Sequence, residues 1–518
     1  MSKFTSNTTV VSAPGKVLLA GGYLVLDRLY SGLVIATSSR FYSSVFPKVT
    51  TGDQSQYAVA SRITVRAGQF PPEASAWSYD IILTPSGVKV KPVMGEAGRN
   101  KFVEVAVTKT LEYSIQWLSR GTEDGGKSVL SKIGKGLEVV VLADNDFYSQ
   151  REQLTSASLP PRLSSLDSLP PFSPLPRPIG QTNKTGLGSS AALVTSLIGA
   201  LLLHLDIVSL PSSDEAESMH AAKIGNLQGT PALDTIHSLA QFCHCLAQGK
   251  VGSGFDVSSA IYGSHIYTRF SPSLLKPLMS DLPPPGPDLM AHLDPKNWDQ
   301  KVQAARLPKG IRMLLADVDA GTDTPSFVGK VLQWRTDKAE EAKELWTRLS
   351  DTNTRLEGML ARLIGMEDEE VYKEGSTMKQ RDVRQLIQDL LFETASTLSV
   401  SPFHFVTALR ADKKEIRSLM REMSEKSGVP IEPLEQTRLL DTCSSSPGVL
   451  GGGVPGAGGY DAIVLLVLDH PEVIRRVEDI WEGWTEMSVC PLSARQSDGG
   501  LRVEDVDQVP GLKQALAE

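Results

Sequence analysis

A short stretch rich in glycine and serine stands directly before a long apolar run, and its residue types suit the binding of a phosphate. Residues 183–192 read NKTGLGSSAA. A helix that begins at Ser189 or Ser190 directs its unpaired backbone N–H groups and the positive end of its dipole back toward the glycines. Because glycines let a phosphate approach the backbone closely, the stretch predicts an anion site. An ordinary helix start preceded by flexible glycines would explain the same residues.

Two well-known nucleotide-binding loops fit this stretch poorly. Residues 186–191 match the dinucleotide pattern G-x-G-x-x-A, and Asp206 even lies twenty residues after the first glycine. That pattern needs a strand immediately before the glycines, whereas the chain here reads PLPRPIGQTNKT. A Walker A loop is excluded because no Gly-Lys-Ser/Thr ends the stretch. The sequence therefore predicts a phosphate loop of another kind.

Two further stretches decide which kind. Residues 12–27 read SAPGKVLLAGGYLVLD, and residues 452–462 read GGVPGAGGYDA. With the glycine–serine stretch between them, they resemble in order and separation the three signature motifs of the GHMP kinases, the superfamily of galactokinase, homoserine kinase, mevalonate kinase and phosphomevalonate kinase. Adding DNDFYSQR at 144–151 and AQGKVGSGFDV at 247–257, the chain resembles the eukaryotic, fungal-type phosphomevalonate kinases over nearly its whole length.

The resemblance implies a fold and a reaction. The fold is α+β with two GHMP kinase domains. Residues 1–285 would form an ATP-binding α/β domain similar to the second domain of a ribosomal protein, with a Pro/Ser-rich insertion at about 155–180. Residues 305–518 would form a ferredoxin-like α+β domain. The implied reaction transfers the γ-phosphoryl group of ATP to (R)-5-phosphomevalonate in the isoprenoid and sterol pathway, with ATP and Mg²⁺ as cofactors.

The resemblance assigns the ATP phosphates to the glycine–serine stretch. The Ser190 hydroxyl is expected near the β-phosphate and Mg²⁺. No obvious glutamate stands a suitable distance before Asp256 to bind the metal, so either another acid serves or the metal relies on the phosphates and Ser190. Lys184 either adds positive charge or is a solvated loop lysine, and Asn145 is expected on the adenine side. The predicted ATP-binding residues are Lys184, Gly186, Leu187, Gly188, Ser189, Ser190, Ala191, Ala192 and Asn145.

Lys16 and Asp256 are the predicted catalytic residues. Lysines that match Lys16 in relatives reach the transferring phosphoryl group, where a cation stabilises the transition state. The aspartate that matches Asp256 is often described as the base that deprotonates an acceptor hydroxyl. An acceptor phosphate has a second pKa of about 6 and is largely dianionic at neutral pH. We therefore expect Asp256 mainly to orient Lys16 and pair with it, with base catalysis secondary.

The acceptor carries a carboxylate and a phosphate, so its pocket needs cations. Lys250, six residues before Asp256, is the first candidate, and the charged stretch RADKKEIR at 410–417 is the second, although such a run is usually the wet face of a helix. Hydrogen-bonding candidates, each of which could equally be structural, include His244. The predicted substrate-binding residues are Tyr23, Lys250, Ser253, Gly458 and Gly459.

Composition and length set limits on the alternatives. The chain has 518 residues, of which 41% are hydrophobic and 22% charged, as in an ordinary protein of two or so globular domains. Its net charge of −8 argues against nucleic-acid and anionic-membrane partners. Four cysteines are too few for a disulfide scaffold, and Cys243-His244-Cys245 matches no common zinc spacing. We expect a cytoplasmic monomer or weak homodimer whose partners are small molecules.

Strands and helices must alternate to position these motifs. Short apolar runs predict strands at 9–12, 17–20, 63–66, 137–142, 311–318 and 461–468. Helices are expected over 102–118, 190–205, 377–398 and 402–427, from Thr324 toward Leu349, and from Pro471 onward. The insertion at 155–180 is expected to be a mobile lid over the site.

Three other functions fit parts of the pattern. A mevalonate kinase or a diphosphomevalonate decarboxylase is disfavoured by the GSGFD form and by Gly21-Gly22-Tyr23, which stands where the mevalonate kinase branch usually has G-E-H. A silent ligand sensor would have no reason to keep Lys16, Ser190 and Asp256. A dinucleotide-dependent oxidoreductase needs the strand that the sequence before Gly186 does not supply.

Overall fold

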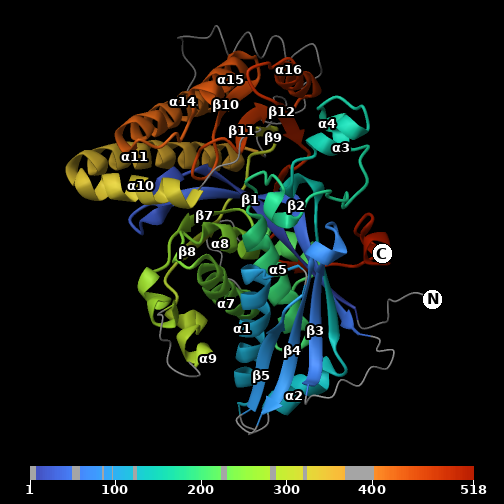
Figure 1. Cartoon of the computed structure of the whole chain (residues 1–518). Helices are drawn as coiled ribbons and strands as arrows, with labels where there is room; N and C mark the ends of the chain where they lie inside the picture. Colours follow the sequence, from blue (N-terminus) through green and yellow to red (C-terminus); the bar gives the residue numbers. More distant parts are fainter. Residues whose placement is uncertain are drawn as a thin grey trace.

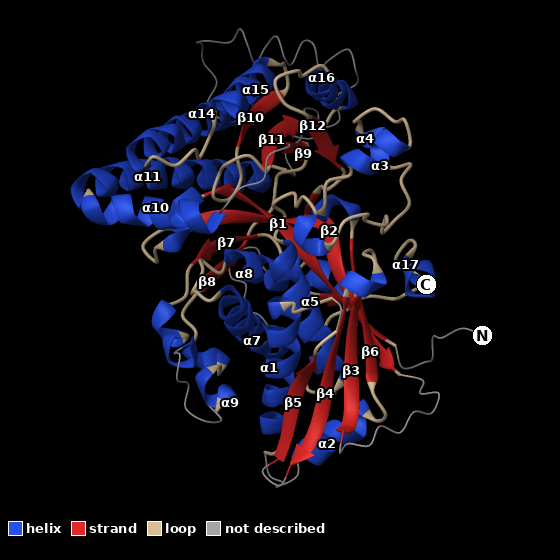
Figure 2. Cartoon of the chain, in the orientation of Figure 1, coloured by secondary structure: helices blue, strands red, loops and turns tan. Residues whose placement is uncertain are grey.

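The computed structural model describes residues 8–48, 59–84, 87–95, 97–120, 125–222, 230–279, 288–318, 324–367 and 402–517. Within these ranges the chain builds two β-sheets, and Figures 1 and 2 show helices packed on each of them. This mixed architecture agrees with the predicted α+β class. The predicted helix over 377–398 lies outside the described residues. No described helix is long and apolar enough to cross a membrane.

The larger sheet occupies the lower part of Figure 1 and has ten strands in the described residues. Its main path runs β14-β1-β2-β6-β3-β4-β5, while β13 and β7 pair with β2, and β8 pairs with β7. All pairs are antiparallel except β3 with β6. The strands are β1 (Thr9–Ala20), β2 (Ser31–Pro47), β3 (Val59–Ala67), β4 (Ala76–Thr84), β5 (Gly87–Val93), β6 (Leu137–Ala143), β7 (His265–Thr268), β8 (Lys301–Ala304), β13 (Gln496–Ser497) and β14 (Arg502–Val503).

The helices beside the larger sheet position the predicted motifs. Helix α5 is buried along almost its whole length and packs on β1 and β2, because nearly every residue of its sequence is small or apolar. It also contacts α1, α7 and α8. The helices in this part of the chain are α1 (Lys101–Leu118), α2 (Gly125–Ile133), α3 (Arg151–Ser156), α4 (Leu163–Leu166), α5 (Ser189–His204), α6 (Ser213–Ala222), α7 (Pro231–Gln248), α8 (Phe255–Tyr262) and α9 (Leu289–His292).

The smaller sheet lies in the upper part of Figure 1 and is entirely antiparallel, in the order β10-β11-β9-β12. Its strands are β9 (Ile311–Val318), β10 (Val449–Gly453), β11 (Ala462–Leu468) and β12 (Val489–Leu492). The helices that follow β9 are α10 (Thr324–Asp337), α11 (Ala339–Gly365), α14 (Pro402–Ser427), α15 (Leu434–Ser445), α16 (Pro471–Glu482) and α17 (Leu512–Ala517). The amphipathic face predicted after Pro471 is confirmed, since α16 buries Val473, Val477 and Trp481.

Two local predictions need correction. The strands predicted at 9–12 and 17–20 form one strand, β1, whose pairing with β2 shifts register between Pro14 and Lys16. Proline cannot donate to the ladder, so the irregularity falls where the sequence permits it. The single helix predicted from Thr324 to Leu349 is two helices, because α10 ends at Asp337 and α11 begins at Ala339.

The last part of the chain returns to the larger sheet. The predicted division into 1–285 and 305–518 separates the two sheets up to Leu492, but β14 pairs with β1 and β13 with β2. Arg40 on β2 donates to the Gly500 carbonyl at 2.5 Å. Leu512 and Leu516 of α17 pack in a buried cluster with β2 and β6. The two sheets are therefore tied together by the chain that follows the smaller one.

The insertion at 155–180 contacts both parts of the molecule. Arg162 pairs with Asp479 and Glu482 of α16, and the Leu163 amide donates to Glu478 at 2.8 Å. Leu166 packs against Cys490 of β12, in agreement with the position of α4 beside β12 in Figure 1. The role of the insertion at 155–180 as a lid stays a prediction. To open, such a lid would have to break these contacts.

The segment that returns to the larger sheet passes close to Gly263, so a side chain at this position should affect stability. Gly263 has a φ of +81°, and a Cβ there would lie 1.8 Å from the Asp498 carbonyl oxygen. We expect Gly263→Ala to lower the free energy of unfolding by at least about 2 kcal/mol, measured by urea denaturation. The control is Gly358→Ala in α11, where no atom lies within 4 Å of the added Cβ. That change should leave stability unchanged or raise it by about 0.5–1 kcal/mol, and an equal loss in both variants would contradict the expectation.

Candidate active site

One large cavity, of about 1090 Å³, collects most of the predicted site residues. Its walls come from β1, from the loop before α5, from the loop between α7 and α8, and from the loop between β10 and β11. The predicted residues on these walls are Lys16, Tyr23, Lys184, Gly186, Leu187, Gly188, Ser189, Ser190, Lys250, Ser253, Asp256 and Gly458. The tertiary structure thus brings four distant parts of the sequence to a common space.

Lys16 joins the first strand to the glycine–serine loop. Its backbone amide donates to the Leu187 carbonyl at 2.9 Å, and its Nζ donates to the Gly186 carbonyl at 2.6 Å. The ammonium also lies 5.6 Å from the centroid of the Phe255 ring. These contacts hold the charge beside the loop rather than in open solvent.

The loop itself has the geometry of an anion cradle. Gly186 and Gly188 have φ angles of +76° and +82°, in the left-handed region that favours glycine. Gly188 is the N-cap of α5 and no side chain caps the helix, so its first N–H groups face the cavity. A Cβ on Gly188 would lie 3.0 Å from Cε of Lys16. An uncapped helix start beside a lysine fits a nucleotide's phosphates.

Asp256 stands in the first turn of α8 and lines the same cavity. The turn that places it needs Gly254, whose φ is +84° and where a Cβ would come within 3.0 Å of three side chains. Gln241 donates to the Gly254 carbonyl at 2.6 Å, and the Tyr267 hydroxyl donates to the Ser253 carbonyl at 2.9 Å. The carboxylate therefore has a rigid support.

His244 connects Ser190 with Asp256. Its Nε2 lies 3.1 Å from the Ser190 Oγ and 3.9 Å from the Asp256 Oδ2, and the ring is nearly fully buried. Burial lowers the pKa of His244 and so favours the neutral ring, although Asp256 opposes the shift. A neutral imidazole can hydrogen-bond to the Ser190 hydroxyl through Nε2 without adding charge to the site, while Asp256 lies beyond hydrogen-bond distance.

Burial also shifts the pKa of Lys16. Desolvation lowers the pKa of Lys16, while the negative charges of Asp256 and Asp461 raise it. The net shift is downward, because the two carboxylates do not fully replace the water that the ammonium has lost. The site is therefore short of negative charge, which the phosphates of a bound nucleotide would supply.

The cavity also contains residues that the sequence motifs did not single out. Arg269 lines the cavity and donates to the carbonyls of Leu26, Val251 and Gly252. Asp461 also lines the cavity. Because it lies in the motif at 452–462, the sequence contained a signal that could have indicated it. Arg269 has no motif around it and could be found only by its position in the fold. Tyr23, which was predicted, donates to the Ala457 carbonyl at 2.6 Å.

Several predicted residues do not reach the cavity surface. Asn145 donates to the Pro170 carbonyl and accepts from the Ser173 amide, so its side chain supports the insertion. Gly459 donates its amide to the Ile431 carbonyl at 2.9 Å. Ala191 and Ala192 are buried in α5 behind the loop. Their positions follow from packing, which a motif does not specify.

The alternatives to a kinase loop can be judged from the same region. No strand immediately precedes Gly186, since the described residues 149–188 form α3, α4 and a short 3₁₀ turn, and a single bridge joins Lys184 to Tyr148. The dinucleotide hypothesis is therefore wrong. Cys243 and Cys245 are buried, and burial raises the pKa of both thiols. In the described ranges, no three histidine, cysteine or acidic side chains form a metal cluster.

Comparisons with known proteins agree with this geometry. The sequence model of the family described as GHMP kinases C terminal matches residues 405–483. The phosphomevalonate kinase of Aspergillus fumigatus is 36% identical over 97% of this chain and 98% of its own. The peroxisomal phosphomevalonate kinase of Arabidopsis thaliana is 36% identical over 96% of each chain.

A solved structure extends the likeness to the fold. The phosphomevalonate kinase of Streptococcus pneumoniae, in complex with phosphomevalonate and AMPPNP, superposes with a TM-score of 0.52 at 13% identity. It covers 94% of this chain and 99% of its own. At this identity the match concerns the fold alone. One of the two curated relatives is named as peroxisomal, so the cytoplasmic location stays a prediction.

The electrostatics of Lys16 predict a measurable titration. Because burial lowers its pKa, Lys16 should lose its proton at a lower pH than the ordinary lysine value of about 10.4. AMPPNP should raise this pKa, because its phosphates stabilise the ammonium. Competitive amine labelling read by mass spectrometry, over roughly pH 7 to 11, measures both values in one protein. A Lys16 that titrates at the ordinary value without nucleotide, or that AMPPNP does not shift, would refute this account.

Proposed function

The chain belongs to the phosphomevalonate kinase family of the GHMP kinases, and from this premise we propose how its own residues perform the transfer of the ATP γ-phosphoryl group to 5-phosphomevalonate. The observation that supports the assignment most is the convergence of Lys16, the uncapped start of α5 and Asp256 on one cavity. Phosphoryl transfer asks a protein mainly for positioning and charge neutralisation. Those three features supply both.

We infer that the loop 186–190 holds the phosphates of ATP. The N–H groups at the start of α5 point toward the cavity and favour negative charge. Lys16 would stay beside the γ-phosphoryl group and stabilise its negative charge during transfer. Lys184 lies on the same wall and adds positive charge at the mouth.

Magnesium fits this site through oxygen atoms. The Ser190 hydroxyl lies on the cavity wall, and Asp256 and Asp461 bring carboxylates to the same space. Hard oxygen donors of this kind, with substrate phosphates, are what Mg²⁺ prefers. When bound, the ion would neutralise phosphate charge. His244 would orient the Ser190 hydroxyl through the contact between its Nε2 and the Ser190 Oγ.

Asp256 acts mainly on Lys16 in this proposal. Its negative charge raises the pKa of Lys16 against the effect of burial, and thus helps to keep the ammonium protonated. In the structure the Lys16 ammonium donates to the Gly186 carbonyl rather than to Asp256. The acceptor phosphate is already largely ionised at neutral pH, so proton removal contributes little.

The acceptor would enter beside the loops that carry Ser253 and Gly458. Tyr23, Ser253 and Gly458 line this part of the cavity, and Lys250 is exposed at its edge. Arg269 adds a second cation and also holds the carbonyls of Val251 and Gly252, the two residues between Lys250 and Ser253. These residues are proposed to bind the acceptor phosphate and its hydroxyl.

An acceptor panel tests the proposal. Release of ADP from ATP–Mg²⁺ should occur with 5-phosphomevalonate and not with mevalonate, 5-diphosphomevalonate or homoserine. Lys16→Ala should reduce the rate by at least about 10³-fold, because it removes the cation at the transferring group. Lys414→Ala, an exposed lysine of α14, serves as the control and should be unaffected. Tight nucleotide binding without turnover on any of the four acceptors would favour the sensor instead.

The role of Asp256 makes a separate prediction. Asp256→Asn keeps the shape of the side chain and removes its charge. We expect kcat to fall by about 10- to 100-fold, less than in Lys16→Ala, and the acidic limb of the pH–rate profile to persist. A loss as large as that of Lys16→Ala, together with disappearance of the acidic limb, would identify Asp256 as a general base.

A further inference from the structure

Lys413, on α14, is a buried cation without a matching anion among the residues that the structure describes. Its side chain is 2% exposed, and its Nζ donates to the Leu19 carbonyl of β1 at 3.3 Å. An ammonium has three donors, and this long bond to a neutral carbonyl is the one that the described residues provide. Burial of a charge is unfavourable unless it is paired and hydrogen-bonded.

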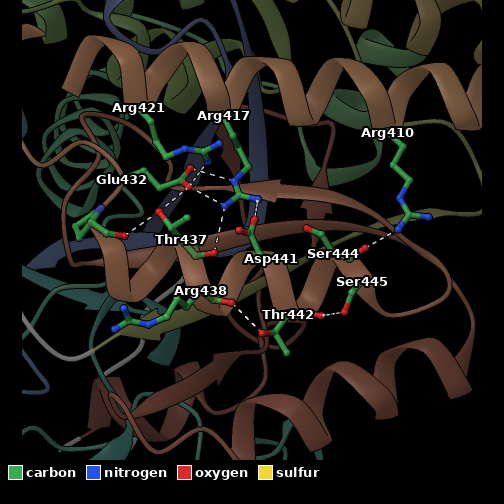
Figure 3. Close-up of polar contacts among 11 residues, drawn as sticks. Arg410, Arg417, Arg421, Glu432, Thr437, Arg438, Asp441, Thr442, Ser444 and Ser445 are labelled. Carbon is green, nitrogen blue, oxygen red and sulfur yellow. Dashed lines mark hydrogen bonds and ion pairs between the residues drawn. The ribbon is translucent and has the colours of Figure 1, made fainter. Parts of the chain in front are cut away.

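The nearest carboxylate is engaged by other side chains. Figure 3 shows Glu432 between Arg417 and Arg421. Arg417 donates to both Glu432 oxygens, at 3.0 and 2.7 Å, and Arg421 donates to one at 2.7 Å. The remaining arm of Arg417 donates to Asp441 at 2.7 Å. With Lys413 there are three cations for two carboxylates, so this cluster carries one excess positive charge.

A small cavity lies beside Lys413. It has a volume of about 40 Å³, and its walls include Lys413, Arg417, Glu432 and the backbone of several glycines. That space suits a carboxylate group or a few waters but not a whole substrate. The glycines on its walls are Gly21, Gly22, Gly452, Gly453 and Gly456.

The small cavity adjoins the active site. Leu18, Gly22, Val454 and Gly456 line both cavities. Leu19, whose carbonyl holds Lys413, is three residues after Lys16 on β1, a separation of about 10 Å along a strand. An extended five-carbon acid with a phosphate at its far end spans roughly 7–8 Å between the two charged groups. The lysine side chains at both ends cover the remaining distance.

We propose that Lys413 binds the carboxylate of the acceptor, at the end opposite the phosphate that receives the phosphoryl group. The inference rests on the proposed function, because it takes its acceptor from there. A carboxylate in the small cavity would neutralise the excess positive charge of the cluster and accept the free ammonium donors. Burial and Arg417 lower the pKa of Lys413 to about 8, against the opposing charge of Glu432, in keeping with a site that lacks part of its counter-charge.

The test deletes the charge from each partner in turn. Lys413→Met keeps most of the side-chain volume, and the carboxamide of 5-phosphomevalonate keeps the shape of the acceptor. Each single change should raise the KM for the acceptor by about 10- to 100-fold, with the KM for ATP unchanged. The two changes together should cost little more than one, because both remove the same interaction. The control is Lys414→Met, the exposed neighbour, which should leave both KM values unchanged.

Each other outcome contradicts the inference in a recognisable way. If the effects of Lys413→Met and the carboxamide multiply, Lys413 does not contact the carboxylate. If inorganic phosphate raises the melting temperature of the wild type but not of Lys413→Met, while the KM for 5-phosphomevalonate is the same in both, the site binds a free anion instead. Should Lys413→Met fail to fold, Lys413→Gln enters the same cycle.

The same cycle separates this inference from the proposed function. A wild-type protein that turns over no 5-phosphomevalonate refutes the function. Normal wild-type turnover with an unchanged KM in Lys413→Met refutes only the inference.

Discussion

The site depends on a lysine held against backbone carbonyls at the mouth of a buried helix. Lys16 donates to the Gly186 carbonyl, and its own amide donates to Leu187, so β1 and the loop before α5 form one unit. The ammonium and the uncapped start of α5 present positive charge to the same cavity. Burial of the Lys16 ammonium is unfavourable without an anion beside it, and a bound anion offsets that cost. Affinity for phosphate thus follows from the packing of the fold.

Glycines make this close approach possible at two positions. At Gly188, a side chain would press on Lys16, and at Gly254 it would press on Phe270, Gln241 and Tyr267. Both residues also have positive φ angles, which other residues rarely adopt. The loop and the turn that present Lys16 and Asp256 to each other therefore require glycine for two independent reasons, conformation and space.

Helix α14 and the segment that follows it contribute to the site through buried charge. Ile431 accepts the Gly459 amide, and the next residue, Glu432, is held by Arg417 and Arg421. A buried ion pair of this kind adds little net stability compared with apolar packing, but it fixes geometry. Here it fixes the loop that carries Gly458 to the cavity wall, and among the described residues it leaves Lys413 bonded to the Leu19 carbonyl without a carboxylate of its own.

The sequence by itself determined the motifs and most of the elements. The strands at 311–318 and 461–468 and the helices over 102–118, 190–205 and 402–427 follow from apolar runs and periodicity, which are local properties. Motif order was enough to assign Lys16, Ser190 and Asp256 to one site. The tertiary structure decided what depends on contacts between distant residues: the return of β13 and β14 to the larger sheet, the position of Arg269, and the use of Asn145 to support the insertion. It also showed Lys413 to be buried, although the charged stretch around it reads as a solvated helix face. Burial is set by what packs on a helix, and no local pattern contains that information.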